Sequence, residues 1–204
     1  MGKIFLLFTM YTIVFVSIAF NQNEHILNDK KNRTTLAEIA NDTSHKASET
    51  VIIFLQWYRK NYETIGKIKL VNNLPNDEDY DSTKHYSVNR DGIDKYLDCM
   101  KSSGYLSSKY IDYWKEKFIK GEEYLEKEPM IDEMPPNGFD YDFVLLTQEM
   151  DYVFKMLDKA KIKYENIIDN AAEVHLAINE KWIYDYRLSY DGKKWLIDSI
   201  DYLK

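Results

Sequence analysis

The strongest helical pattern in the chain begins near residue 48. Apolar side chains recur there every three or four positions, at Val51, Phe54, Leu55, Tyr58, Tyr62 and Ile65. This spacing predicts one face of a long amphipathic helix. Ser48 is the expected N-cap of the helix, and Gly66 lies near its expected end.

Two further helices are predicted after the first. The second begins at Asp91 and stops at Gly104, and the third opens at 106–108 with the sequence Leu-Ser-Ser. The apolar stripe of the third helix consists of Tyr110, Ile111, Trp114, Phe118 and Leu125. We expect a polar loop over 72–90 and a proline-containing connector over 126–142.

The hydrophobic period changes from helical to alternating near residue 160. The rest of the chain predicts consecutive strands over 162–169, 172–180, 182–190 and 194–202, with Asn179-Glu180 and Asp191-Gly192 at turns. The segment 148–160 fits either a short helix or an edge strand. Together these elements predict an α+β fold over 47–204, in which three N-terminal helices pack on a curved antiparallel sheet of about four strands.

Three short motifs carry a resemblance to a known fold. They are Leu-Ser-Ser-Lys-Tyr-Ile at 106–111, Phe-Asp-Tyr-Asp at 139–142 with Gln148 nearby, and Trp-Leu-Ile-Asp-Ser-Ile at 195–200. With the order of elements, they make the chain similar to the cone-shaped, nuclear transport factor 2-like and cystatin-like proteins, and to a family of exported bacterial domains of unknown function within them. The resemblance implies a cone-like sheet around the first helix. Phe143 departs from that family, in which a proline often follows the second aspartate.

Large aromatic side chains alternate along the third predicted strand. Trp182, Tyr184, Tyr186 and Tyr190 face one way, and the residues between them face the other way. In a cone-shaped fold the concave face is partly core and partly pocket. We therefore expect at least half of this strip to pack under the first helix and the remainder to line a cleft, and the predicted ligand-binding residues are these four and Asp142.

An uncharged apolar run over 4–20 is typical of an export signal. Ser17 and Ala19 place small residues at positions −3 and −1 of a cut after Ala19. We expect a signal peptide over 1–19, a flexible lead over 20–46, and a periplasmic or secreted bacterial protein. The alternative is an uncleaved anchor that keeps the protein at the membrane.

Composition excludes several kinds of partner. The formal net charge is −7 and lysine and arginine do not cluster, so we expect no nucleic-acid partner, since such partners are bound through their phosphates. Cys99 is the only cysteine, which excludes an internal disulfide and a cysteine-based zinc or iron–sulfur site. The chain also has no phosphate-binding glycine loop and no nucleophile elbow, and we expect no cofactor.

Two acidic groups invite a chemical interpretation. Asp77, Asp79 and Asp81 have the spacing of the first three calcium ligands of an EF-hand, but the required glycine and glutamate are missing, which favours a solvated acidic loop. Asp140 and Asp142 could share a proton or a divalent ion, although capping of the following segment is the favoured interpretation.

Histidine spacing predicts no metal site, because no two histidines stand at the separation of metal ligands. His175 is the only histidine in a predicted strand. We expect it on the outer surface of the sheet.

Three classes of function remain open. The favoured one is a non-catalytic binding domain of the bacterial envelope with an unknown protein or small-molecule partner, for instance an immunity protein that neutralises a toxin with a basic active site. The second is a small-molecule enzyme of the isomerase or dehydratase type, for which Asp142, Asp185 and Tyr184 are the first candidates. The third is a role at the membrane surface, which requires the signal to stay attached.

Overall fold

The structure is a computed structural model that describes residues 46–75, 77–130, 136 and 138–203. The predicted signal and the lead up to residue 45 lie outside these residues. The described residues form an α+β fold, as predicted, with a four-stranded antiparallel sheet at the end of the chain. None of the described helices combines the length and the apolar composition needed to cross a bilayer.

Helix α2, Ala47–Ile65, forms where the apolar pattern predicts it and buries its apolar face. The predicted N-cap is wrong, because the helix begins directly after Lys46, whose side chain makes no capping bond. Ser48 lies in the first turn, and its backbone N–H and its hydroxyl donate to the two carboxylate oxygens of Glu165. A carboxylate from a distant strand therefore accepts a hydrogen bond from a free backbone N–H in the first turn of α2, as a local capping residue would.

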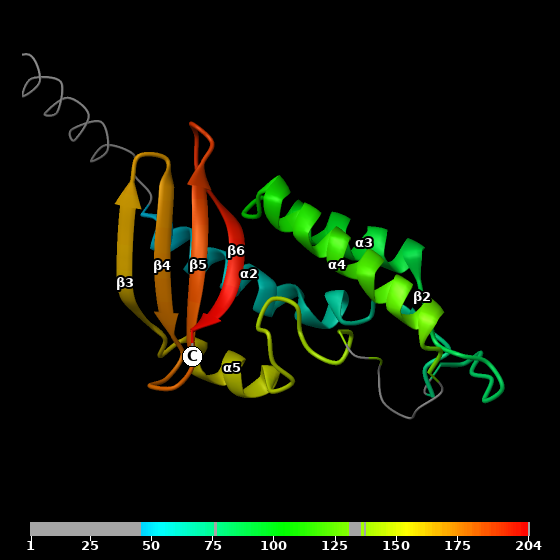
Figure 1. The fold of residues 1–204 in the computed structure, drawn as a ribbon. Coiled ribbons are helices and arrows are strands. Elements are labelled where there is room, and N and C mark those ends of the chain that lie inside the picture. Colours follow the sequence, from blue (N-terminus) through cyan, green and yellow to red (C-terminus); the bar gives the residue numbers. More distant parts are fainter. Residues whose placement is uncertain (1–45, 76, 131–135, 137, 204) are drawn as a thin grey trace, which may run out of the picture. The chain divides into compact units, whose positions relative to one another are not determined.

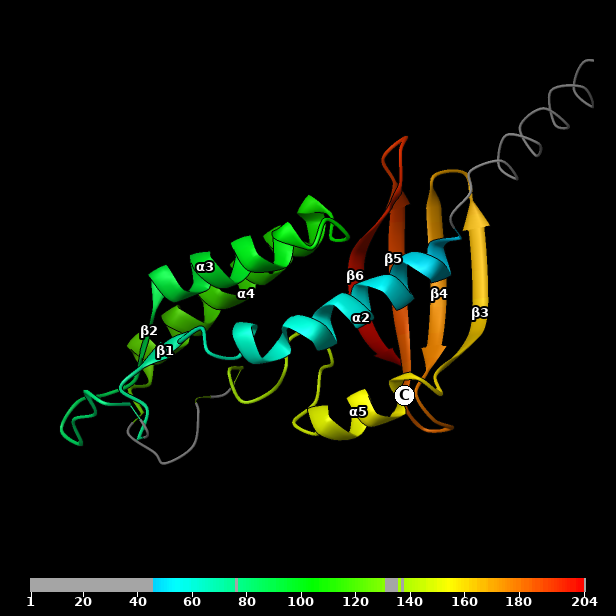
Figure 2. The same cartoon turned by 180° about the vertical axis from the view of Figure 1, so that it is seen from behind.

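The strands of the main sheet follow one another as an antiparallel meander: β3 Lys161–Ile168, β4 Ala171–Ala177, β5 Ile183–Tyr190 and β6 Trp195–Leu203. Helix α2 lies across one face, which we call the inner face, and contacts β3, β4 and β6 (Figure 1 and Figure 2). No helix of the described chain covers the opposite, outer face, which is turned toward the viewer in Figure 1. This one-sided cover agrees with the alternating burial along β4, where Ala172, Val174 and Leu176 are buried and the residues between them are half-buried.

Helices α3, Arg90–Ser102, and α4, Ser108–Lys127, pack against each other, and α4 also contacts β6. The side chain of Asn89 caps α3 by accepting from the N–H of Gly92, and Ser107 caps α4 in the predicted place. Gly104 separates the two helices with a φ of 74°, the left-handed conformation that a helix stop favours.

The segment 72–90 is not the continuous loop that its polarity predicts. Its ends pair as two short antiparallel strands, β1 Val71–Asn72 and β2 Ser87–Val88. Between them, the buried side chain of Asn73 accepts from the N–H of Asp81 and donates to two carbonyls, which fastens the loop internally.

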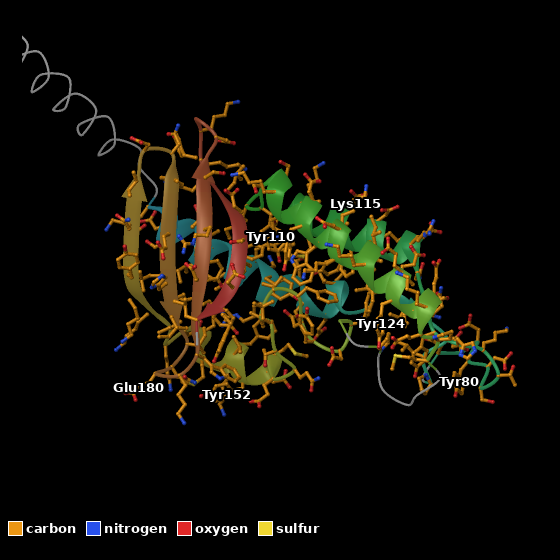
Figure 3. The ribbon with its side chains drawn as sticks, viewed as in Figure 1. Tyr80, Tyr110, Lys115, Tyr124, Tyr152 and Glu180 are labelled. Atoms are coloured by element: carbon orange, nitrogen blue, oxygen red, sulfur yellow. The ribbon has the colours of Figure 1, made fainter. Side chains whose placement is uncertain are left out.

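Helix α5, Met150–Leu157, decides the open prediction for 148–160 in favour of a helix. It precedes β3 in the chain, and Tyr152 on it contacts Trp182, the residue just before β5, with ring centroids 5.2 Å apart. Figure 3 shows Tyr152 and Glu180 at the same end of the sheet. The helix thus covers the end of the sheet near the turn between β4 and β5.

Candidate functional site

A cavity of about 790 Å³ lies beside the C-terminal half of α2. Its walls come from Tyr58 and Tyr62 of α2, the following segment 65–71, Tyr96 of α3, and the segment 139–143 that precedes α5. We call it the tyrosine cavity. Its volume lies in the range of small-ligand sites, roughly 300–1,000 Å³.

Aromatic rings from α2, α3 and the segment 139–143 form one part of the lining of the tyrosine cavity. Tyr58 and Tyr62 meet edge to face with centroids 5.9 Å apart, and Tyr96 meets Phe143 in the same way at 5.7 Å. Tyr141 also packs edge to face on Phe143 at 5.6 Å. These rings hold one another in place, so the wall is formed by packing before any ligand enters.

Carboxylates outnumber lysines at the tyrosine cavity. Besides Asp142, the lining residues include Asp77, Glu78, Asp79 and Asp140 against Lys67 and Lys69. The Lys69 ammonium already pairs with two of them, at 2.9 Å from Asp77 and 3.2 Å from Asp79. The cavity therefore keeps an excess of negative charge.

The predicted acidic loop does not gather its three aspartates around one point. Asp77 accepts from the N–H of Leu74 and pairs with Lys69, whereas Asp81 accepts from the N–H and hydroxyl of Thr83. Asp77 and Asp79 therefore share Lys69, whereas Asp81 is bound to Thr83.

Asp142 is the most constrained carboxylate of the tyrosine cavity. Its Oδ2 accepts from the Tyr58 hydroxyl at 2.5 Å, and its Oδ1 accepts from the backbone N–H groups of Val144 and Leu145 at 2.9 and 2.6 Å. Asp142 therefore caps the segment that follows it, as predicted. Asp140 lies apart from this arrangement and accepts longer hydrogen bonds from the backbone N–H of Gly138 and the side chain of Gln148.

Burial controls the protonation of this pair. Burial raises the pKa of the Asp142 carboxyl above its ordinary value of 3.8, although the bonds from Tyr58, Leu145 and Val144 act in the opposite direction. Burial, followed by the nearby charge of Asp142, also raises the pKa of the Tyr58 hydroxyl far above its ordinary range. Tyr58 consequently remains the proton donor in this bond.

The middle of the loop 142–147, Phe143 to Leu145, is buried, which is unusual for a loop because its backbone polar groups lose water. Tyrosine hydroxyls replace that water. Tyr110 of α4 donates to the carbonyl of Phe143, and Tyr184 of β5 donates to the carbonyl of Leu145 at 2.6 Å. With Tyr58, three tyrosines from three elements bind one loop, and Tyr110 can be located in Figure 3 where α4 faces β6.

The structure places the predicted ligand-binding residues in two environments. Tyr184 and Tyr186 are fully buried in the core on the inner face, and Trp182 and Tyr190 are half-buried near the two ends of β5. Of the five residues, Asp142 alone lines the tyrosine cavity. Tyr184 does not line the cavity, but its hydroxyl donates to the carbonyl of Leu145 in the loop 142–147, which contributes to the cavity wall.

The sequence did not predict that the segment 65–71 and the rings of Tyr62, Tyr96 and Tyr141 line a cavity. The first two rings belong to predicted helices, where an aromatic residue at helical spacing indicates core. Only the acidic loop and the Phe-Asp-Tyr-Asp motif at 139–142 pointed to this region, and nothing in the sequence showed that they meet.

No protein family, curated protein or solved structure matches this chain.

Residues able to hold a metal ion lie elsewhere, on the outer face of the sheet. Glu173, His175 and Asp185 each present one ligand atom there, and these three atoms all lie within 4.8 Å of one another. His175 is on the outer face, as predicted, but it is half-buried in a cluster of charged side chains rather than solvated.

Proposed function

We propose that this chain is an exported bacterial binding domain that acts without catalysis, and that its tyrosine cavity receives a cationic group of the partner. The observation that carries the proposal is the combination of aromatic walls with an excess of carboxylates in one cavity. A wrapping of the sheet around α2 in the manner of cone-shaped domains is part of the proposal.

The chemistry of the walls favours a cation over other ligands. Aromatic faces attract ammonium and guanidinium groups through the ring quadrupole, and carboxylates add direct attraction. Glu78 and Asp140 have no ion-pair partner within the described residues, so they remain available to a ligand. An anionic ligand would meet net repulsion at the same place.

A lysine or arginine of a protein partner fits this cavity, as does a small organic cation. The formal net charge of −7 supports a basic protein partner, because complementary charge accelerates association and rejects acidic competitors. Neutralisation of a toxin with a basic active site is the specific form of the proposal. A pull-down that yields no stable protein partner would favour the small-molecule form.

The alternative is a small-molecule enzyme that uses Asp142, whose raised pKa suits proton transfer. Both of its oxygens already accept hydrogen bonds from the protein, three in all. Proton exchange with a substrate would break the bonds that hold the loop 142–147. We therefore favour a structural role for Asp142 and a binding role for the cavity.

A matched pair of probes tests the binding proposal. Benzyltrimethylammonium and its neutral isostere neopentylbenzene have the same shape and differ in charge. We expect the cation to bind about 5- to 30-fold more tightly in calorimetric titration, because a desolvated cation–π contact contributes about 1–2 kcal/mol. Equal affinity for the two probes, or no binding of the cation, would refute the proposal.

Variants of the two unpaired carboxylates refine this test. In a chain with Glu78→Gln and Asp140→Asn, the preference for the cation should decrease. Asp201→Asn is the matched control, because it removes an exposed carboxylate from β6, outside the cavity. Loss of the preference in the control as well would mean that net charge, and not the cavity, selects the cation.

A further inference from the structure

Three charged side chains and one imidazole form a square on the outer face of the sheet. Glu173 and His175 stand two residues apart on β4 and therefore point the same way. In the register between β4 and β5, His175 lies opposite Asp185 and Glu173 lies opposite Arg187. We call these four residues the outer-face cluster.

Arg187 divides the carboxylate oxygens of the outer-face cluster into two sets. Its Nε lies 3.0 Å from Oδ2 of Asp185, and its Nη1 lies 3.0 Å from Oε2 of Glu173. The other oxygen of each carboxylate is directed at His175, whose Nε2 lies 2.9 Å from Oε1 of Glu173 and 3.5 Å from Oδ1 of Asp185. Arg187 thus holds one oxygen of each carboxylate, and the other oxygen of each lies beside Nε2 of His175.

One carboxylate oxygen of Asp185 makes no hydrogen bond within the described chain. Its side chain is only 8% exposed, yet its Oδ1 accepts no hydrogen bond from any described residue. A buried carboxylate oxygen without a hydrogen bond is costly, because it has lost water and the contact with His175 Nε2, at 3.5 Å, replaces that water poorly. With two carboxylates and one guanidinium, the cluster also keeps one uncompensated negative charge when the imidazole is neutral.

We propose that Glu173, His175 and Asp185 bind one divalent transition-metal ion, Zn²⁺ foremost. Imidazole nitrogen and carboxylate oxygen are ordinary Zn²⁺ ligands, and bonds of ~2.0–2.1 Å in a tetrahedron place ligand atoms roughly 3.3 Å apart. The 2.9 and 3.5 Å separations around His175 bracket that value. The ion would give Oδ1 of Asp185 its missing partner and balance the negative charge.

The surroundings support the orientation of the imidazole. The ring of Tyr164, which lies opposite His175 in the register of β3 with β4, packs on the His175 ring with centroids 4.8 Å apart. Three protein ligands leave a fourth position for water or for a donor from a partner. None of the cluster residues lines the tyrosine cavity, so this site is independent of the proposed binding function.

Calorimetric titration of the untagged, metal-free chain with Zn²⁺ tests the site. We expect one ion per chain, and a loss of affinity of at least ~10-fold in His175→Gln and in Asp185→Asn. His85→Gln, in the exposed loop, and Asp201→Asn, opposite Asp185 on β6, are matched controls and should bind as the parent does. Titration with Co²⁺ should give visible absorption bands without the thiolate band that Cys99 would cause.

Other outcomes of these titrations would overturn the site. Zn²⁺ binding that survives both His175→Gln and Asp185→Asn, or that disappears in His85→Gln, would place the ion elsewhere. Absence of binding to the parent chain would mean that the outer-face cluster is an ion-pair network only. If a variant fails to fold by circular dichroism, Glu173→Gln replaces it with the same expected loss.

Discussion

The hydroxyl of Tyr58 donates to Oδ2 of Asp142 at 2.5 Å and thereby joins α2 to the loop 142–147. The other oxygen of Asp142 accepts from two backbone N–H groups of the same loop. One carboxylate thus fixes both the shape of the loop and its place against the helix. The wall of the tyrosine cavity depends on this connection, because Tyr58 and Asp142 both line it.

Replacement of Asp142 by alanine should destabilise the protein far more than replacement by asparagine. Asp142→Ala leaves the N–H groups of Val144 and Leu145 and the hydroxyl of Tyr58 without their acceptor, and we expect a cost of about 3 kcal/mol. Asp142→Asn keeps a carbonyl oxygen for the backbone bonds and should stay within ~1 kcal/mol of the parent. Urea denaturation measures both, and equal stability of the two variants would contradict the capping role.

The contribution of Asp142 should also depend on pH. Because burial raises its pKa in the folded state above 3.8, protonation favours folding. Its stabilising contribution is therefore complete below the unfolded-state pKa of 3.8 and is lost as the pH rises through the folded-state pKa. The free energy of unfolding of the parent, relative to Asp142→Asn, should fall over that interval. A difference that grows with pH would show that hydrogen bonds outweigh burial.

Two glycines near the tyrosine cavity should respond differently to alanine. A Cβ on Gly92 would lie 1.9 Å from the backbone oxygen of Lys69, which borders the cavity and cannot move independently. We expect Gly92→Ala to cost about 3 kcal/mol through overpacking. Thermal or urea unfolding would measure the loss, and a neutral Gly92→Ala would mean that α3 does not contact the segment 65–71 as closely as described.

Gly121 is the matched comparison for Gly92. Its Cβ would lie 2.8 Å from the ring of Phe139, a half-buried side chain that can rotate away. The gain in helix propensity from Gly to Ala, up to ~1 kcal/mol, offsets much of this clash. We expect Gly121→Ala to change the free energy of unfolding by less than ~1 kcal/mol, and a loss as large as that of Gly92→Ala would contradict this reasoning.

The remote cap of α2 predicts a local effect on dynamics. Glu165→Ala removes both acceptors of Ser48 and an anion from the N-terminus of the helix, which should cost about 1 kcal/mol. Amide hydrogen exchange in the first turn of α2 should accelerate. Lys163→Ala, an exposed residue on the same strand, is the control and should leave that exchange unchanged.

Periodic burial explains which parts of the fold were predictable. The helices α2, α3 and α4 and the strands β3 to β6 follow apolar patterns in the chain, and their observed bounds agree closely with the predicted ones. The N-cap of α2 was predicted wrongly because a local rule favoured Ser48, whereas Glu165 provides the acceptor from 117 residues away. Such a contact leaves no trace in local sequence.

The candidate sites were less predictable for a related reason. The hydroxyls of Tyr58, Tyr110 and Tyr184 all bind the loop 142–147, which has no periodic pattern of its own. The outer-face cluster depends on the register between β4 and β5. In the sequence, the outer-face cluster is indicated only by polar side chains at alternate positions of two strands that a short turn joins: Glu173 and His175, then Asp185 and Arg187.

The central claim is that the tyrosine cavity is the place where a cation binds, and an NMR titration with benzyltrimethylammonium tests it most directly. Backbone amide shifts should concentrate on Tyr62, Lys69 and Tyr141, which line the cavity. Shifts confined to Trp182 and Tyr190 at the ends of β5, with the cavity residues unchanged, would contradict the claim.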